Sequence, residues 1–511
     1  MKKIYIYVMC SLLAVSSLSA QEGLGTHLRN IIQNQEKGLL VAARLIEACG
    51  LCDTLDLQED EKYKFAYNAG IIPSEINDNM FYEKKFFAPQ ERKYGYTLFA
   101  ETDDFWSREG IDPTAPELLE QVTSWIVSNG LYNRNDMLKT DKDYKNEDHV
   151  LYQWVTYHIL PVRIHQDRLV HHINEYGYNL DAPDSLTIPV TEYYVTMGKR
   201  RLLRTYESAK SGGVYLNRFP KEDKGRNGTG NEIYCSPENE GIYIDKAKAI
   251  PCSSSAMIYP IDKVLAFTEQ VADQLGSIRL RFDVASLFPE LTNSNVRLKN
   301  STNNQDMNVY IPSGDYPFLS DISFKNDCIM IYQTGWKLGW KNLYGDEFQI
   351  AGNFDIILRL PPVPRRGTYE LRYKNLHTGN RPLVQIYFGT EKENLPPAGM
   401  PINLSKGFDN EKQYGWEADG SNDLYNQQVD NELYYNGVMK GAKSIGSGNT
   451  ERDDRNSMRV VLARQNMDPD KTYYVRIRSL LDTRYKPLYL DYFELCPKEV
   501  YDNSENPEDI W

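Results

Sequence analysis

The sequence predicts a mixed α+β domain followed by an all-β sandwich of the jelly-roll kind. Apolar residues recur at helical spacing mainly in the first 160 residues, whereas the chain beyond about residue 277 carries eight short runs with strand-like alternation. At 511 residues the chain is also longer than one compact domain usually is. We therefore place the α+β domain at 24–270, the sandwich at 278–498 and a C-terminal tail at 499–511.

The N-terminus has the layout of a cleaved export signal. Lys2 and Lys3 precede an apolar run that ends at Ala20, before Gln21. We expect residues 1–20 to be removed and the mature protein to lie in the periplasm, at the outer-membrane surface or outside the cell. No later segment offers about 18 uncharged apolar residues, so we predict no transmembrane segment in the mature chain.

The mature chain is acidic. The formal net charge of −13 becomes −15 when Lys2 and Lys3 leave with the signal. An acidic chain without a basic cluster is a poor partner for nucleic acid or anionic lipid. A neutral ligand such as a glycan is compatible with this charge, and the 37 tyrosines offer flat faces that suit polar rings.

The helical segments come first in the chain. Residues 24–57 carry apolar side chains at helical spacing, and 117–128 and 147–160 are amphipathic. Between them, residues 96–99 form a strand-like run, and Thr102 is placed to cap a short helix.

Short strands and long loops follow. In the α+β domain we expect strands in LTIPVTEYYVTM, RLLRTYE, GVYLNRF and the stretch 241–267, with a Gly-rich loop at 220–240. Residues 399–455, rich in Gly, Asn and Asp, are predicted to form an elaborate loop. The eight sandwich runs are SIRLRFDV, CIMIYQT, FDIILRL, GTYELRYK, PLVQIYFG, SMRVVLA, TYYVRIR and PLYLDYFEL.

The cysteine pattern gives no disulfide framework, because six cysteines remain over nearly 500 residues. Cys49 and Cys52 have redox spacing, but they close an apolar helical stretch, which favours a structural role. Cys235 and Cys252 could bridge a hairpin, and the sequence leaves that pairing open.

The decapeptide TLFAETDDFW holds three carboxylates, Glu101, Asp103 and Asp104. They could be the acid and base of an enzyme, the ligands of a metal, or a capped turn without chemistry. Thr102 and Asp103 follow a strand and precede a helix, where side-chain oxygens satisfy free backbone N–H groups. We therefore predict a capped turn.

Three segments of the N-terminal half resemble the conserved boxes of fasciclin domains. They are TLFAETDDFW (97–106), VLYQWVTYHILPVRI (150–164) and GIYIDKAKAIPCSSSAMIYPIDKVLAF (241–267), in the order found in that family. Insertions are then expected at 129–146 and 207–240. Two departures, Glu instead of Pro at 101 and Tyr-Pro instead of His-x at 259–260, concern surface recognition more than the fold.

The resemblance implies structural or adhesive roles rather than catalysis for Thr102, Asp103, Tyr157, His158 and Asp262. For His158 the alternatives are a metal ligand or general base, and a core histidine bonded to the loop after Pro161. The adjacent pair His171-His172 makes a poor metal site without a third ligand.

The C-terminal half is similar to the galactose-binding-like jelly rolls of carbohydrate-binding modules. The resemblance rests on residues 367–373, on PLVQIYFG and on residues 490–495. It implies that aromatic rings on loops stack on sugar rings while polar neighbours bond the hydroxyls; the alternative is that these rings only pin the loops. The candidate glycan-binding residues are Trp336, Trp340, Tyr344, Asp346 and Trp416.

No cofactor is predicted, and calcium stays an open alternative. DGSND (419–423) has the oxygen-rich composition of a calcium loop but lacks the twelve-residue pattern and its bidentate Glu.

Three functions compete. The favoured one is an exported, non-catalytic envelope protein for adhesion or glycan binding, because chains that join these modules resemble accessory components of Gram-negative glycan-capture systems. A glycoside hydrolase would need two carboxylates, such as Asp346 or Glu347 with Asp419. The third is a structural subunit that contacts only envelope or matrix proteins.

Overall fold

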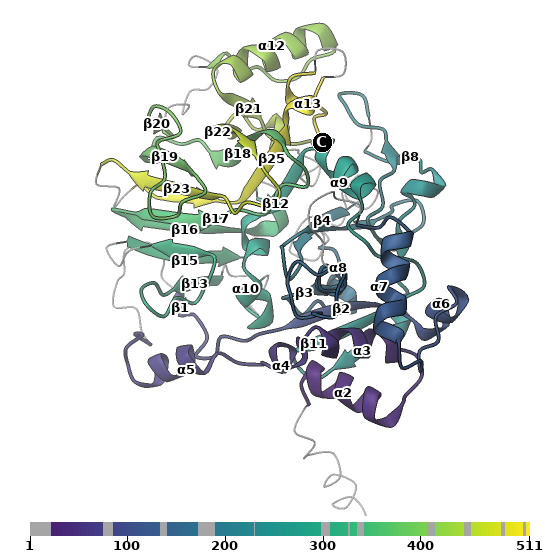
Figure 1. Cartoon of the computed structure of the whole chain (residues 1–511). Coiled ribbons are helices and arrows are strands. Elements are labelled where there is room, and N and C mark those ends of the chain that lie inside the picture. Colours follow the sequence, from purple (N-terminus) through teal and green to yellow (C-terminus); the bar gives the residue numbers. More distant parts are fainter. Residues whose placement is uncertain are drawn as a thin grey trace, which may run out of the picture.

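The chain folds into helices and strands that form several sheets, as the computed structural model shows in Figure 1. The predicted presence of both helices and sheets is thereby confirmed. The described residues are 22–74, 85–132, 140–171, 190–228, 230–297, 307–324, 328–334, 342–405, 414–443, 451–481, 486–503 and 507–511. The expected signal at 1–20 lies outside them.

The N-terminal half holds the helices predicted at 24–57, 117–128 and 147–160. The first stretch is broken because Gln35 ends a helix at φ 53° and Gly50 follows the next at φ 71°, both left-handed conformations. The helices are α2 (Leu24–Asn34), α3 (Leu40–Ala48), α4 (Cys52–Leu55), α5 (Glu61–Asn68), α6 (Asp103–Arg108), α7 (Leu118–Ser128) and α8 (Val150–Tyr157).

A four-stranded sheet in this half has the order β10-β11-β2-β3. Its strand β2 (Tyr96–Glu101) runs parallel to β11 (Ala256–Ile261) and antiparallel to β3 (Ile159–Leu160), while β10 (Ile250–Cys252) forms one edge. All six residues of β2 are buried, as expected for a strand covered on both faces. The strand therefore directs Glu101 into the interior.

A second four-stranded sheet has the order β4-β5-β6-β9. The chain between β6 and β9 forms a separate two-stranded ribbon, β7-β8. The ribbon falls within 220–240, where only a loop was predicted. The strands are β4 (Val190–Val195), β5 (Leu202–Glu207), β6 (Val214–Leu216), β7 (Lys221–Glu222), β8 (Glu232–Tyr234) and β9 (Ile242–Tyr243).

Among the described residues the C-terminal half contributes to three five-stranded sheets, and each of the eight predicted runs contains a strand. The sheet orders are β12-β25-β18-β22-β21, β14-β17-β23-β19-β20 and β1-β13-β15-β16-β24, in which β1 (Lys85–Phe87) comes from the N-terminal half. The strands are β12 (Leu280–Asp283), β13 (Met307–Ile311), β14 (Ile322–Phe324), β15 (Cys328–Thr334), β16 (Asp346–Gly352), β17 (Asp355–Arg359), β18 (Gly367–Leu376), β19 (Leu383–Gly389), β20 (Ile402–Asn403), β21 (Val438–Lys440), β22 (Ser457–Met467), β23 (Tyr474–Ser479), β24 (Leu488–Leu490) and β25 (Tyr492–Pro497).

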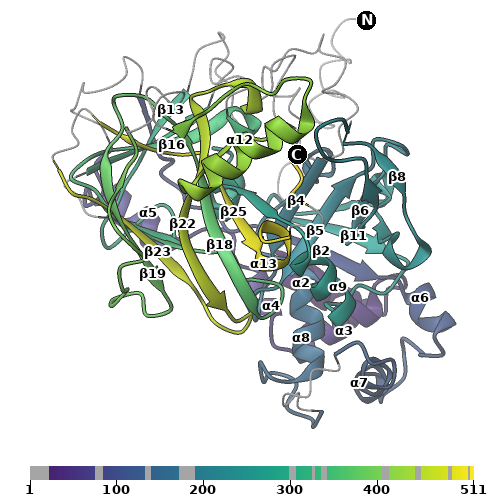
Figure 2. The ribbon, with the colours of Figure 1, turned by 90° about the horizontal axis from the view of Figure 1, so that it is seen from above.

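The two halves are joined in space. Strand β1 (Lys85–Phe87), from the N-terminal half, pairs in parallel with β13 of the C-terminal half. One hydrophobic cluster includes residues of both halves, such as Phe99 and Phe348, and a second cluster packs the helices of the N-terminal half. Figure 2 shows β18 and β22 on one side of the molecule and the helices α3, α7 and α8 on the other. The predicted boundary near residue 277 thus divides the sequence, while one of the two hydrophobic clusters crosses it.

Helices also occur in the C-terminal half, which the sequence did not predict. The stretch 399–455, expected to be a loop, contains α12 (Asp423–Tyr435). Its side chains are largely polar, and the signal is confined to the Asn422 cap and to the buried Val429 and Leu433. The other α-helices of the described C-terminal half are α10 (Pro289–Asn293) and α13 (Lys498–Tyr501), and α9 (Glu269–Gly276) lies just before the boundary near residue 277.

Among the described residues, no helix combines the length and the apolar character needed to cross a bilayer.

Candidate functional site

Thr102 and Asp103 of the segment TLFAETDDFW accept hydrogen bonds from backbone amides at the N-termini of two helices. The Thr102 hydroxyl accepts a hydrogen bond from the Phe105 amide at 3.2 Å, which confirms the predicted cap of α6. The buried Asp103 carboxylate reaches further, because it accepts from the amides of Gly38, Leu40 and Val41 at 2.6–3.1 Å. It thereby satisfies free N–H groups at the start of α3, a helix without a cap from its own flanking residue.

Glu101 forms a buried pair with His158. The Glu101 Oε1 atom accepts from the Leu265 amide and lies 3.0 Å from His158 Nε2. His158 Nδ1 contacts the Trp154 carbonyl oxygen at 2.7 Å, so this ring bonds to its own helix and not to the loop after Pro161. The adjoining cavity has a volume of about 20 Å³, room for about one water molecule. This pair therefore holds α8 against the end of β2.

The other fasciclin-like positions also make internal contacts. The buried Tyr157 hydroxyl donates to the Leu202 carbonyl at 3.2 Å and accepts from Asn217 at 3.0 Å. Asp262 is exposed and pairs with Arg108 at 2.5 Å.

The candidate glycan residues do not form an exposed platform. Tyr344 and Trp416 are both buried, so neither ring is accessible for stacking against a sugar in this conformation. Asp346 is completely buried, and its carboxylate accepts from the Tyr332 hydroxyl at 2.6 Å. Trp336 and Trp340 lie outside the described residues.

The carboxylates considered for hydrolysis or calcium have other partners. Asp419 pairs with Lys440 at 2.8 Å and with Arg452 at 2.5 Å. Glu347 is buried and accepts from Asn342 at 2.6 Å. Among the described residues no group of three or more His, Cys, Asp or Glu side chains could hold a metal ion.

Cys49 and Cys52 are not joined by a disulfide. Burial raises the pKa of Cys49 to about 12 and also raises that of Cys52. Redox chemistry requires thiolates, so the structural interpretation has more support. Cys235 and Cys252, whose pairing the sequence left open, are not bonded to each other either.

A cavity of about 320 Å³ lies where the two halves meet; we call it the seam cavity. One wall comes from segments near Tyr94, Arg163 and Ser255, and the other from the segment around Asn293 and Arg297. Figure 1 shows α10, which ends at Asn293, between the sheets of the two halves. Ligand pockets often lie at such junctions, and this volume is near the lower end of their usual range.

Buried ionisable groups surround His171 and Arg297, two residues that line the seam cavity. His171 Nδ1 lies 2.9 Å from Glu192 Oε1, and Arg297 pairs with Asp283 at 2.6 Å. Tyr344, at φ 57°, lies with its ring centroid 5.6 Å from that of His171. A left-handed conformation is unusual for a tyrosine and is often found at functional sites. The sequence candidate Tyr344 thus lies beneath the cavity rather than on the surface.

The pKa values of buried groups near His171 and Arg297 are shifted from their ordinary values. Burial raises the pKa of Asp283 to about 6 despite the nearby charge of Arg297. Burial and the charge of Asp283 raise the pKa of Asp346 well above its ordinary value. Burial lowers the pKa of His171, which favours a neutral ring that donates to Glu192. Perturbed groups next to a cavity are typical of functional sites.

Asn293 fixes the wall of the seam cavity. Its side-chain oxygen accepts from the Arg163 amide at 2.9 Å, and its nitrogen donates to the Pro161 carbonyl at 3.3 Å. Gly95 permits this approach, because a Cβ atom there would lie 2.4 Å from the Asn293 oxygen. The Arg163 side chain is thereby held where it lines the cavity.

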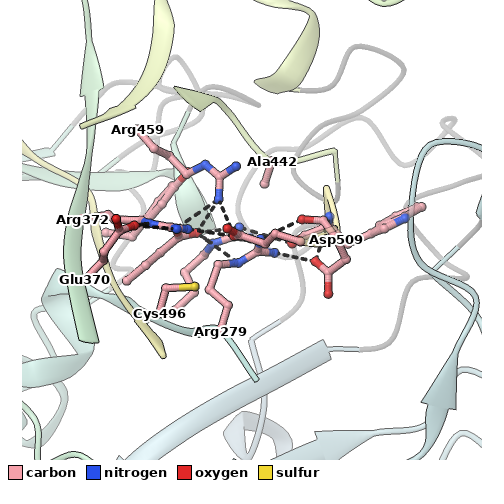
Figure 3. Close-up of polar contacts among 12 residues, drawn as sticks. Arg279, Glu370, Arg372, Ala442, Arg459, Cys496 and Asp509 are labelled. Carbon is pink, nitrogen blue, oxygen red and sulfur yellow. Dashed lines mark hydrogen bonds and ion pairs between the residues drawn. The ribbon is translucent and has the colours of Figure 1, made fainter. Parts of the chain in front are cut away.

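A second charged cluster, drawn in Figure 3, is structural. Arg279 binds Glu508 at 2.7 Å and Asp509 at 2.9 Å, while Arg372 binds Glu508 at 2.7 Å. Arg372 also bonds to Glu370, so the polar face of β18 is covered instead of solvated. These ion pairs attach residues 507–511 to the sheet.

Sequence reasoning missed the residues that line the seam cavity. Arg163 at the end of the second fasciclin-like box and His165 and Arg168 directly after it form a small basic group, which was a usable signal. Asn293 and Arg297 had none, because their importance depends on a contact between distant parts of the chain.

Comparisons with known proteins assign no family to this chain. No family model matches, and no curated protein matches. Two solved structures show weak similarity. The mosquito-larvicidal Cry4Aa toxin from Bacillus thuringiensis is 13% identical at a TM-score of 0.19, over 61% of this chain and 39% of that chain. A Paenibacillus xanthan lyase is 10% identical at a TM-score of 0.21, over 61% and 22%. The match thus spans well under half the length of either protein, and scores this low carry no argument about fold or function.

Proposed function

We propose that this chain is an exported, non-catalytic envelope protein that binds a glycan in the seam cavity, as an accessory component of a Gram-negative glycan-capture system. The observation that supports this most is the cavity itself, with about 320 Å³ between walls from both halves. Its lining is rich in hydroxyl, amide and guanidinium groups, which suit the many hydroxyls of a sugar.

The proposal includes a fasciclin-like N-terminal half and a jelly-roll-like C-terminal half. The first is supported by the way the three boxes assemble: β2 lies between β11 and β3, and α8 ends at Tyr157 just before β3. The second is supported by antiparallel pairing between the strands of the C-terminal half.

The hydrolase alternative has less support. A hydrolase needs two carboxylates that flank the substrate. Among the described residues that line the seam cavity, the carboxylate side chain is that of Glu59, and it bonds to Lys64 at 2.7 Å. The candidates Asp346 and Glu347 are buried.

A glycan array and a reducing-sugar release assay on the mature protein test this function. We expect binding to a subset of glycans without release of product. His165→Ala combined with Arg168→Ala should weaken binding at least about tenfold, because both exposed side chains line the cavity. Surface plasmon resonance with the best glycan measures this change.

Lys142→Ala is the matched control, since that side chain is exposed and outside the cavity lining. It should bind as the unmodified protein does. Release of reducing sugar would contradict the non-catalytic proposal, and silence on every glycan would favour a subunit that contacts only proteins.

A further inference from the structure

The seam cavity is positively charged within a negatively charged protein. The described side chains that line it include Lys93, Arg163, Arg168 and Arg297, against the single carboxylate of Glu59. The whole sequence carries a formal net charge of −13, so an excess of cations at one cavity is not a consequence of composition.

Several of these charges are balanced by the protein. Glu59 bonds to Lys64 at 2.7 Å, and Lys93 pairs with Glu91 at 3.2 Å. These charges therefore largely cancel without a ligand.

The guanidinium groups of Arg163 and Arg297 are less completely satisfied. The Nε atom of each is buried and has no hydrogen-bond partner among the described residues. Arg297 does bind Asp283 through Nη2 at 2.6 Å. A buried N–H donor without an acceptor is costly, so the described part of the protein supplies too few acceptors for these two guanidinium groups, and both residues line the cavity where an outside acceptor could approach their other N–H groups.

We infer that the seam cavity binds the anionic group of an acidic sugar residue, with Arg163 as its principal partner. This inference rests on the proposed glycan function and names the class of glycan. A guanidinium presents parallel N–H donors that match a carboxylate or sulfate oxygen pair, which a neutral hydroxyl does not. Carboxylate on a uronic acid and sulfate on a sulfated sugar share this chemistry.

Isothermal titration calorimetry on the mature protein distinguishes a sugar carboxylate from a sugar sulfate as the bound anionic group. The probes are galacturonate, galactose 6-sulfate, galactose and succinate. We expect galacturonate or galactose 6-sulfate to bind at least about tenfold more tightly than galactose, as a charge-assisted hydrogen bond allows. The tighter of the two acidic sugars identifies the anionic group.

Variants assign the effect to Arg163. Arg163→Gln should lower the affinity for the acidic sugar about tenfold and that for galactose by clearly less, while Arg163→Lys keeps the charge and should lose less affinity for the acidic sugar. Arg366→Gln is the control, because that side chain is 75% exposed and pairs with Asp468 outside the cavity. Thermal unfolding checks that each variant is folded; should Arg163→Gln fail to fold, Arg168→Gln replaces it.

The outcomes distinguish the two proposals. Equal affinity for galactose and both acidic sugars, or an unchanged affinity in Arg163→Gln, overturns the acidic-sugar inference and leaves glycan binding intact. Binding of succinate without any sugar supports an anion site but overturns the glycan function. No binding of any probe overturns both.

Discussion

Single carboxylates hold together segments that lie far apart in the sequence. Asp103 accepts from three amides near Leu40, more than sixty positions earlier in the chain. Such an ionised acceptor also complements the positive end of the α3 helix dipole. The residue type at position 103 was predictable as a cap, but the helix that it caps is not the one that follows it.

We predict that Asp103→Ala destabilises the protein by about 3 kcal/mol, because several buried amides lose their acceptor at once. Urea unfolding measures the change. Asp104→Ala is the control: its side chain is exposed in the first turn of α6, and its removal should cost less than about 1 kcal/mol. Equal losses of stability in the two variants would mean that the hydrogen bonds between Asp103 and the amides at the start of α3 do not stabilise the protein.

Aromatic residues in predicted loops were the least reliable guide to the site. Tyr344 and Trp416 are followed or preceded by polar residues, which suggested exposed rings. In the structure the Trp416 ring lies 5.7 Å from Lys440 Nζ, and the buried Tyr344 packs against His171 beneath the seam cavity. Local composition does not say which side of a loop another segment covers, so burial at these positions could not be predicted.

At the scale of elements, prediction succeeded where the pattern is local. The run GTYELRYK alternates and forms β18, and PLVQIYFG forms β19, because alternation directly encodes a strand with two different faces. Helix α12 was missed because most of its residues are polar, and few of its positions face the core.

For α12, we predict that Leu433→Ala costs about 2–5 kcal/mol, whereas Leu424→Ala changes stability by less than about 0.5 kcal/mol. Leu433 is completely buried, and Leu424 is 80% exposed on the same helix. Urea unfolding of the two variants gives the comparison. Similar losses would mean that α12 does not pack as described.

At the scale of the whole molecule, acidic residues outnumber basic ones, yet cationic side chains outnumber carboxylates in the described lining of the seam cavity. In the cluster that holds residues 507–511, buried arginines are instead paired with carboxylates (Figure 3). The seam cavity itself could not be predicted, because its walls come from segments on either side of residue 277. Only the basic group at 163–168 was visible in the sequence.

Attachment of the C-terminal residues should depend on pH. Burial alone would raise the pKa of Glu508, but the charges of Arg372, Arg279 and Arg459 outweigh it and lower that pKa below its ordinary value of 4.5. A lowered folded-state pKa means that the ionised group stabilises the fold above about pH 4.5 and that this contribution is lost as the pH falls further.

We therefore predict that Glu508→Gln costs about 3 kcal/mol at pH 7 and that the difference from the unmodified protein shrinks steadily below pH 4.5. Urea unfolding of both proteins between pH 7 and pH 3 measures it, and the comparison cancels other titrating groups. Glu499→Gln, at an exposed site on α13, is the control and should show little difference at any pH. A constant difference for Glu508→Gln would contradict the ionic attachment.

The parallel pairing of β1 with β13 has a consequence for biogenesis. In a nascent chain, Lys85–Phe87 is synthesised long before its partner strand β13. The nearby Arg92 donates a hydrogen bond to the Pro317 carbonyl, which lies 225 positions later in the sequence. Contacts between residues so distant in sequence slow folding, because the entropy cost of closing a large loop comes before the contacts stabilise the structure. The N-terminal half therefore cannot reach its final form while the ribosome is still making the rest of the chain.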